Sequence, residues 1–229
     1  MADITGTNKL IAALPAELGA HLQAIAQEVE LPLKLSLEKP GELISHVYFV
    51  DTGLVSVVAA VGRHQAEVGL IGYEGVTGLA FILGAGSSPN HTMVQGAGTA
   101  LRIPIRALTT AMADNPLLGI RLRRFVHVFM VQASQTALSN SNGKIEVRLA
   151  RWLLMAHDRL QGDQVTLTHE FMAIMLSVRR QGVTVALHEL EGRGLIRSRR
   201  SAVMILDRAG LIEFANGSYG IPEAEVMSH

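Results

Sequence analysis

The chain of 229 residues has no cysteine. This absence excludes disulfide bonds, metal sites built from thiolates, and iron–sulfur clusters that cysteines hold. Charge of one sign is not in excess either, because 20 lysines and arginines balance 20 aspartates and glutamates. No overall charge therefore draws the protein to nucleic acid, and any affinity for DNA must come from a local basic patch.

Long apolar runs are also missing. No run is long enough to span a membrane, and the N-terminus does not join a basic region to an apolar core as a signal peptide does. We therefore expect a cytoplasmic protein that does not contact a membrane. Hydrophobic residues nevertheless make up 48% of the chain, which is enough for a sizeable core.

Motifs that carry catalysis are absent too. The sequence has no G-x-S-x-G nucleophile elbow and no P-loop. An enzyme of the cupin type would need clustered metal ligands such as H-x-H with a following glutamate. His64 and Glu67 are near each other, but no H-x-H occurs. We therefore expect neither an enzyme nor a metal site.

Residues 168–196 have the pattern of a helix-turn-helix. Thr168 is a suitable N-cap. The apolar positions that follow are spaced i, i+3, i+4, i+7, as on one face of a helix: Phe171, Ile174, Met175 and Val178. After a short break, a second helix begins near Arg180, and Gly192 and Gly194 end it.

The polar side of the second helix suits the reading of DNA. Arginine can pair with guanine and glutamine with adenine, and a recognition helix reads bases with its N-terminal residues. The candidate DNA-binding residues here are Arg179, Arg180, Gln181, Thr184 and His188. An ordinary surface helix with solvated side chains is the alternative.

A basic hairpin follows this helix. Apolar runs at 195–196 and 202–206 flank a turn that contains Arg199 and Arg200, which predicts a β-hairpin wing in contact with phosphates. Between residues 176 and 208, seven arginines face three acidic residues, a local balance of 7 − 3 = +4. Such a patch is what phosphate binding requires.

The N-terminal half has a different character. Residues 3–30 have a helical pattern, and Pro15 opens a second short helix. From 31 to 105, short β-rich runs alternate with glycines, which predicts a sandwich or barrel that can enclose a small ligand. The expected strands are 33–37, 46–50, 54–60, 66–71, 92–94 and 100–105.

A long helix is expected from Pro116 to Leu138. Its 4-3-4-3 spacing predicts a seam for a parallel dimer, made of Leu118, Leu122, Phe125, Phe129, Gln132 and Thr136. A helix that lies on its own barrel is the alternative. The small and polar residues 139–143 then predict a hinge, and another helix is expected over 144–160.

This order of elements resembles the Crp/Fnr family of bacterial transcription regulators, over nearly the whole chain. Residues 180–184 are similar to the family's R-E-T-V-x-R recognition helix. Arg180 matches the base-reading arginine, Gln181 replaces the usual glutamate, and Val185 stands where the cyclic-AMP regulator has a second arginine. These departures imply a different preferred half-site.

The resemblance implies an α+β fold in three parts. These are a cyclic-nucleotide-binding-like β-roll (jelly roll) over 1–115, a dimerisation helix and hinge over 116–143, and a winged helix-turn-helix over 144–229. It implies a homodimer that binds palindromic double-stranded DNA and acts on RNA polymerase. The rival hypothesis is a ligand-sensing or scaffolding module that acts through protein contacts.

The family's effector motifs are poorly matched. At the cyclic-nucleotide positions the chain has Gly78 and Leu79, and then Asn90, His91 and Thr92, with no arginine for a phosphate. A phosphate without a cationic partner is costly to bury, so we expect no tight binding of cyclic AMP. We predict no cofactor; a haem site that uses His46, His64 or His91 is the minor alternative.

Overall fold

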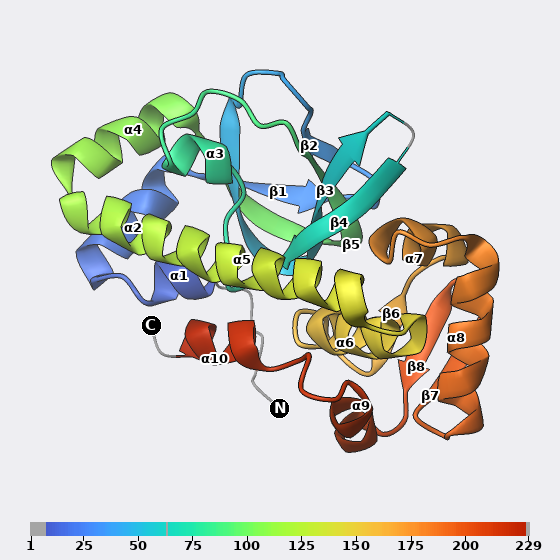
Figure 1. The fold of residues 1–229 in the computed structure, drawn as a ribbon. Coiled ribbons are helices and arrows are strands. Elements are labelled where there is room, and N and C mark those ends of the chain that lie inside the picture. Colours follow the sequence, from blue (N-terminus) through green and yellow to red (C-terminus); the bar gives the residue numbers. More distant parts are fainter. Residues whose placement is uncertain (1–7, 63, 228–229) are drawn as a thin grey trace.

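The computed structural model describes residues 8–62 and 64–227, which form a β-roll, a long helix and a C-terminal α/β part (Figure 1). The roll is an antiparallel sheet with the order β1-β5-β3-β4, and β2 also pairs with β5. Its strands are β1 (Gln27–Leu31), β2 (Ser36–Glu38), β3 (His46–Val61), β4 (His64–Ile71) and β5 (His91–Pro104).

Two short helices, α1 (Lys9–Ala12) and α2 (Ala16–Ile25), precede the roll. Pro15 is the N-cap of α2, as predicted. The expectation of helix up to Glu30 is wrong at its end, because residues 27–31 pair with β5 as a strand. Residues 3–7 of that expectation lie outside the described residues.

Two of the strands are longer than expected. The strands predicted at 46–50 and 54–60 form one strand, β3, and those predicted at 92–94 and 100–105 correspond to the single strand β5. Irregular pairing between residues 50 and 55 lets β3 bend while it stays paired with β5. Gly53 is required at this bend, since its φ is +89° and a Cβ there would lie 2.5 Å from the Gly96 carbonyl oxygen.

Helices connect the roll to the C-terminal part. After α3 (Leu79–Ile82) in the roll come α4 (Ile105–Asp114), α5 (Pro116–Asn142) and α6 (Ile145–His157). Figure 1 shows α5 running across the molecule beside the roll, with α10 (Ile221–Met227) below it. Among the described helices, none is both long and apolar enough to cross a membrane.

The predicted seam of α5 lies on the chain's own roll. Its first five members are 0–7% exposed in this single chain and pack against roll residues. The assignment of Leu118, Leu122, Phe125, Phe129 and Gln132 to a dimer interface is therefore wrong, and Thr136 is half-buried and bonded to Arg151 within the chain. The same heptad spacing arises because the sheet buries one stripe of the helix.

The predicted hinge is shorter than residues 139–143. Residues 139–142 continue α5, and only Gly143 and Lys144 separate α5 from α6. Polar side chains extend the helix by satisfying backbone and neighbouring groups: Ser141 Oγ donates to the Leu138 carbonyl, and Asn140 accepts from Arg148 Nε at 3.0 Å. At Gly143 a Cβ would lie 2.6 Å from the Ser139 carbonyl oxygen.

The C-terminal part has its own small sheet and helices around one core. The sheet has the order β6-β8-β7, and residues of α6, α7, α8 and α9 share one apolar cluster with it. The elements are β6 (Gln164–Thr166), α7 (His169–Met175), α8 (Arg180–Gly192), β7 (Ile196–Arg199), β8 (Ala202–Ile205) and α9 (Arg208–Phe214). Leu54, Val58 and Leu70 of the roll belong to the same apolar cluster, so the two parts share a core.

Candidate nucleic-acid interface

The helix-turn-helix predicted from the sequence is present as α7 and α8. Thr168 is the N-cap of α7, and its hydroxyl accepts from the Phe171 amide at 3.2 Å. The helix ends at Met175, and Ser177 takes a left-handed conformation with φ +49° to turn the chain. α8 then begins at Arg180, as predicted.

α8 presents one apolar and one exposed face. The buried face is the one predicted: Val183, Ala186, Leu187 and Leu190 are at most 2% exposed. On the other face, Arg180, Gln181 and His188 are exposed, and Arg179 is exposed at the N-cap. Thr184 is half-buried, and its hydroxyl donates to the Arg180 carbonyl at 3.3 Å. The N-terminal end of α8 thus offers polar side chains to a partner.

The wing follows directly, as the sequence predicts. β7 and β8 pair from residue 196 to 205, and Ser201 turns the hairpin with φ +62°. Glu191 accepts from the Ser198 amide, which ties the wing to the end of α8. Arg199 and Arg200 are exposed at the turn. The wing and α8 therefore form one rigid, basic surface.

Ion pairs divide the arginines of this region into two groups. Arg193 pairs with Glu189 at 2.8 Å, and Arg208 pairs with Asp158 at 2.7 Å. Within the described part of the chain, no carboxylate is within 4.0 Å of the five others, Arg179, Arg180, Arg197, Arg199 and Arg200. The unpaired group is exposed and lies at the start of α8 and on the wing, where phosphates and base edges would be met.

The roll contains a cavity of about 240 Å³ between its strands and α5. Leu79, Asn90 and Thr92 line it, as the predicted effector pocket requires, but Gly78 and His91 do not. The Gly78 amide instead donates to Glu38 at 2.7 Å, and His91 bonds to Ser36 at 2.9 Å. Burial raises the pKa of the Glu38 carboxyl, which also lines the cavity, against the effect of its hydrogen bonds from the Gly78 amide, Thr92 and Thr77.

No group of three or more histidines, aspartates and glutamates in the described residues is placed to hold a metal ion. Of the histidines named as haem candidates, His46 bonds to Ser45 and His91 to Ser36. His64 is exposed at the start of β4.

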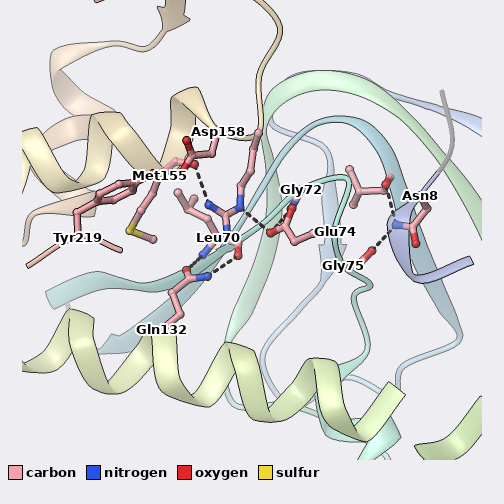
Figure 2. A network of polar contacts seen from close by, with 11 residues as sticks. Asn8, Leu70, Gly72, Glu74, Gly75, Gln132, Met155, Asp158 and Tyr219 are labelled. Carbon is pink, nitrogen blue, oxygen red and sulfur yellow. Dashed lines mark hydrogen bonds and ion pairs between the residues drawn. The ribbon is translucent and has the colours of Figure 1, made fainter. Parts of the chain in front are cut away.

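Buried polar contacts fix the C-terminal part and α5 to the roll (Figure 2). Arg159, just after α6, pairs with Glu74 of the roll at 2.6 Å, and both side chains are about 5–6% exposed. Gln132 of α5 donates to the Leu70 carbonyl at 3.1 Å and accepts from the Leu70 amide at 2.5 Å. The position of α6, and hence of α8 packed on it, is therefore set by the roll.

Glu67 of β4 forms a second buried link. Its carboxyl accepts from Trp152 Nε1 of α6 at 2.7 Å and from the Ser56 hydroxyl. Burial raises the pKa of Glu67 to about 8, although hydrogen bonds from Ser56 and Trp152 and the charges of Arg151 and Arg159 act in the opposite direction. Within the roll, this carboxyl is thus a group whose charge depends on pH near neutrality.

Sequence reasoning did not find these links. A signal for them exists in α6, where seven of the eight residues 149–156 are apolar, so that apolar side chains lie on every side of the helix. The structure buries all eight, including Arg151. A helix that is covered on all sides must contact more than its own small domain. Charged residues such as Glu67 in a β-rich run were a second sign, because carboxylates are rarely buried without partners.

Comparison with known proteins gives consistent matches. The profile of the Crp-like helix-turn-helix domain matches residues 147–214. The transcriptional regulator LdrP of Thermus thermophilus is 30% identical over 185 residues, which cover 75% of this chain and 88% of the relative.

Solved structures share the fold at lower identity. FixK2 from Bradyrhizobium japonicum matches with a TM-score of 0.71 and 17% identity, over 83% of this chain and 97% of that one. The c-di-GMP responsive regulator CLP of Xanthomonas campestris matches with a TM-score of 0.68 and 16% identity, over 83% and 99% of the two chains. Both likenesses concern the arrangement of the roll, the long helix and the helix-turn-helix.

Proposed function

The chain belongs to the Crp/Fnr family of DNA-binding transcription regulators, and we propose that it reads a palindromic operator as a homodimer. Arg180, Gln181 and Thr184 of each copy enter the major groove, and Arg199 and Arg200 of the wing contact phosphates. Arg179 and His188 flank the reading residues and contact the backbone. The observation that carries this proposal is the set of exposed, unpaired arginines at the start of α8 and on the wing.

Dimerisation uses the face of α5 opposite the buried seam. This stripe has its own 4-3-4-3-4 spacing and consists of Ile120, Arg124, His127, Val131, Ser134 and Leu138, beside Met130. Val131 is half-buried and the others are exposed. Ile120, Met130 and Leu138 are 48%, 58% and 57% exposed in the single chain. Three large apolar side chains of one helix thus lie in solvent unless a partner covers them. A second copy of the same helix, packed in parallel, covers them and places two α8 helices on one side of the dimer.

RNA polymerase is the proposed second partner, as in other regulators of transcription.

The roll cavity is the proposed effector site. Among its described lining residues there is a carboxyl group, Glu38, and neither lysine nor arginine. A phosphate in this cavity would have no cation to pair with, so cyclic AMP should not bind. Isothermal titration of the purified protein with cyclic AMP tests this; heat of binding at micromolar affinity would contradict it.

Selection of bound sequences from a random DNA pool tests the function as a whole. Purified protein is used with and without added cell extract as a source of effector. Enrichment of a palindrome, with half-sites about one helical turn apart, is the expected result. Arg180→Ala should lose the preferred base at one position of each half-site. The absence of enrichment in both arms would contradict sequence-specific binding.

A further inference from the structure

Val185 is an apolar residue on the otherwise polar, exposed face of α8. Its side chain is 69% exposed, while Arg180, Gln181 and His188 around it are polar. Valine is also a poorer helix former than alanine, because its β-branch restricts the rotamers available in a helix. The residue therefore contributes neither packing nor helix propensity to the fold, which suggests that its side chain serves an intermolecular contact.

The position of Val185 places it among the base-reading residues. It follows Gln181 by one turn of helix, a rise of about 6 Å, and lies next to Thr184. The exposed sector of α8 that contains Arg180 and Gln181 thus includes Val185 as its apolar member. A helix lying in the major groove would bring all of these side chains to base edges, not to the sugar–phosphate backbone alone.

Groove chemistry limits what a valine can contact favourably. Its methyl groups cannot donate or accept hydrogen bonds, and covering a polar base edge with them would leave that edge unsatisfied. The 5-methyl group of thymine is the apolar feature of the four unmodified base pairs in the major groove. We propose that Val185 reads the 5-methyl group of one thymine in each half-site, an inference that rests on the proposed function.

The neighbouring charges agree with this contact. Glu189, one turn further along α8, is paired with Arg193 at 2.8 Å. Its carboxylate is therefore compensated and does not leave a bare negative charge beside Val185 that would repel DNA. Beyond this ion pair the helix ends at Gly192.

Removal of the methyl group from individual thymines of the DNA tests the contact. Using the palindrome selected by the wild-type protein, each thymine is replaced in turn by deoxyuridine, which keeps the base pairing and loses only the methyl group. At one thymine of each half-site, loss of the methyl group should weaken wild-type binding about fourfold. This is the effect expected when one buried methyl-sized group is removed from an interface. 5-Bromodeoxyuridine, with a bromine in place of the methyl group, should restore binding there.

Protein variants are then tested on the thymine and deoxyuridine operators. Val185→Ala should bind the thymine and deoxyuridine operators equally, while Val61→Ala should keep the full wild-type difference. Val61 is the matched control, because it is an exposed valine (81%) in the roll, away from α8. The readout is competition binding at one fixed salt concentration.

Three outcomes would overturn the proposal: a selected half-site without thymine, a wild-type protein indifferent to deoxyuridine everywhere, or a Val185→Ala variant as sensitive as the wild type. None of these outcomes contradicts the proposed function, because that function is tested by the selection of a palindrome and by the Arg180→Ala variant. Failure to select any palindrome, with and without extract, would reject the proposed function and this inference together.

Discussion

At the scale of the residue, the DNA surface separates side chains that select a sequence from those that only attract DNA. Arg180 is exposed at the start of α8, whereas Arg200 is exposed at the turn of the wing. The first faces base edges in the proposed complex and the second faces phosphates. Both change the binding free energy, but only one should change the preferred sequence.

Arg180→Ala should cost about 1–3 kcal/mol of binding free energy on the selected operator and relax specificity at one base pair. Arg200→Ala should weaken binding to all sequences alike and reduce the salt slope by about one. Titration of both variants on specific and random DNA at several salt concentrations measures this. Equal losses on both DNAs for Arg180→Ala would contradict its role in reading a base.

The buried carboxyl group of Glu67 should make the free energy of unfolding depend on pH. Its pKa is about 8 in the folded chain, against an ordinary value of 4.5. Between these values the folded state keeps a proton that the unfolded state has lost, so this contribution to stability is complete below the ordinary pKa and falls as the pH rises towards 8. Ser56, Trp152, Arg151 and Arg159 are the groups that face this carboxyl.

Glu67→Gln, which is neutral at every pH, should flatten that decline. The wild type should lose up to about 1.4 kcal/mol of unfolding free energy per pH unit more than the variant across this window. Urea unfolding at a series of pH values between about 5 and 8 measures the difference. Parallel curves for the two proteins would mean that Glu67 is ionised in the folded state.

At the scale of the element, α5 has two stripes with the same heptad spacing and different partners. Sequence analysis predicted the helix and one stripe correctly but gave that stripe the wrong partner. Periodicity shows which side of a helix is apolar, and it does not distinguish the chain's own sheet from a second chain. The structure resolves this because Leu118 and Leu122 are 0% and 1% exposed without any partner chain.

The two stripes should respond differently to substitution. Leu138→Asp places a charge on the exposed stripe, where Leu138 is 57% exposed, and should convert the dimer into a folded monomer, as measured by sedimentation, with loss of tight palindrome binding. Leu43→Asp is the control, because Leu43 is 84% exposed on the roll. A Leu138→Asp variant that remains dimeric would exclude this stripe as the interface.

Leu122→Ala acts on the other stripe. It should lower the free energy of unfolding by about 2–5 kcal/mol, since it removes buried methyl groups from the contact between α5 and the roll. The dimer should persist in the folded fraction. Sedimentation combined with urea unfolding separates this loss of stability from a loss of association.

The sequence predicted local elements better than contacts between distant ones. The helix-turn-helix, its buried face and the wing were predictable because apolar spacing, an N-cap and turn residues lie within a few positions of each other. The lengths of β3 and β5 were not, since bulged pairing lets a strand pass through Asp51–Gly53, a segment with turn residues. Trp152 with Glu67 joins positions 85 residues apart, and no local pattern encodes that pairing.

At the scale of the whole molecule, the roll and the DNA-binding part share an apolar core and an ion pair. Arg159→Ala would leave the Glu74 carboxylate buried without its cation. The variant should lose about 3–5 kcal/mol of stability. Replacing both residues with methionine should restore most of this loss, because no uncompensated charge remains. Thermal unfolding of the two variants measures it, and similar melting temperatures for both would contradict a buried ion pair.

The pairing of Gln132 with both backbone groups of Leu70 has a mechanical consequence. A slide of α5 along β4 by one residue, or a rotation about its own axis, would break both hydrogen bonds in a buried setting. The roll and the first five turns of α5 therefore move as one lever. Any displacement that reaches α8 must turn about Gly143–Lys144 and must also break the buried contacts that hold α6 on the roll, Arg159 with Glu74 and Trp152 with Glu67. A change in the separation of the two α8 helices therefore needs an effector that binds strongly enough to open these contacts.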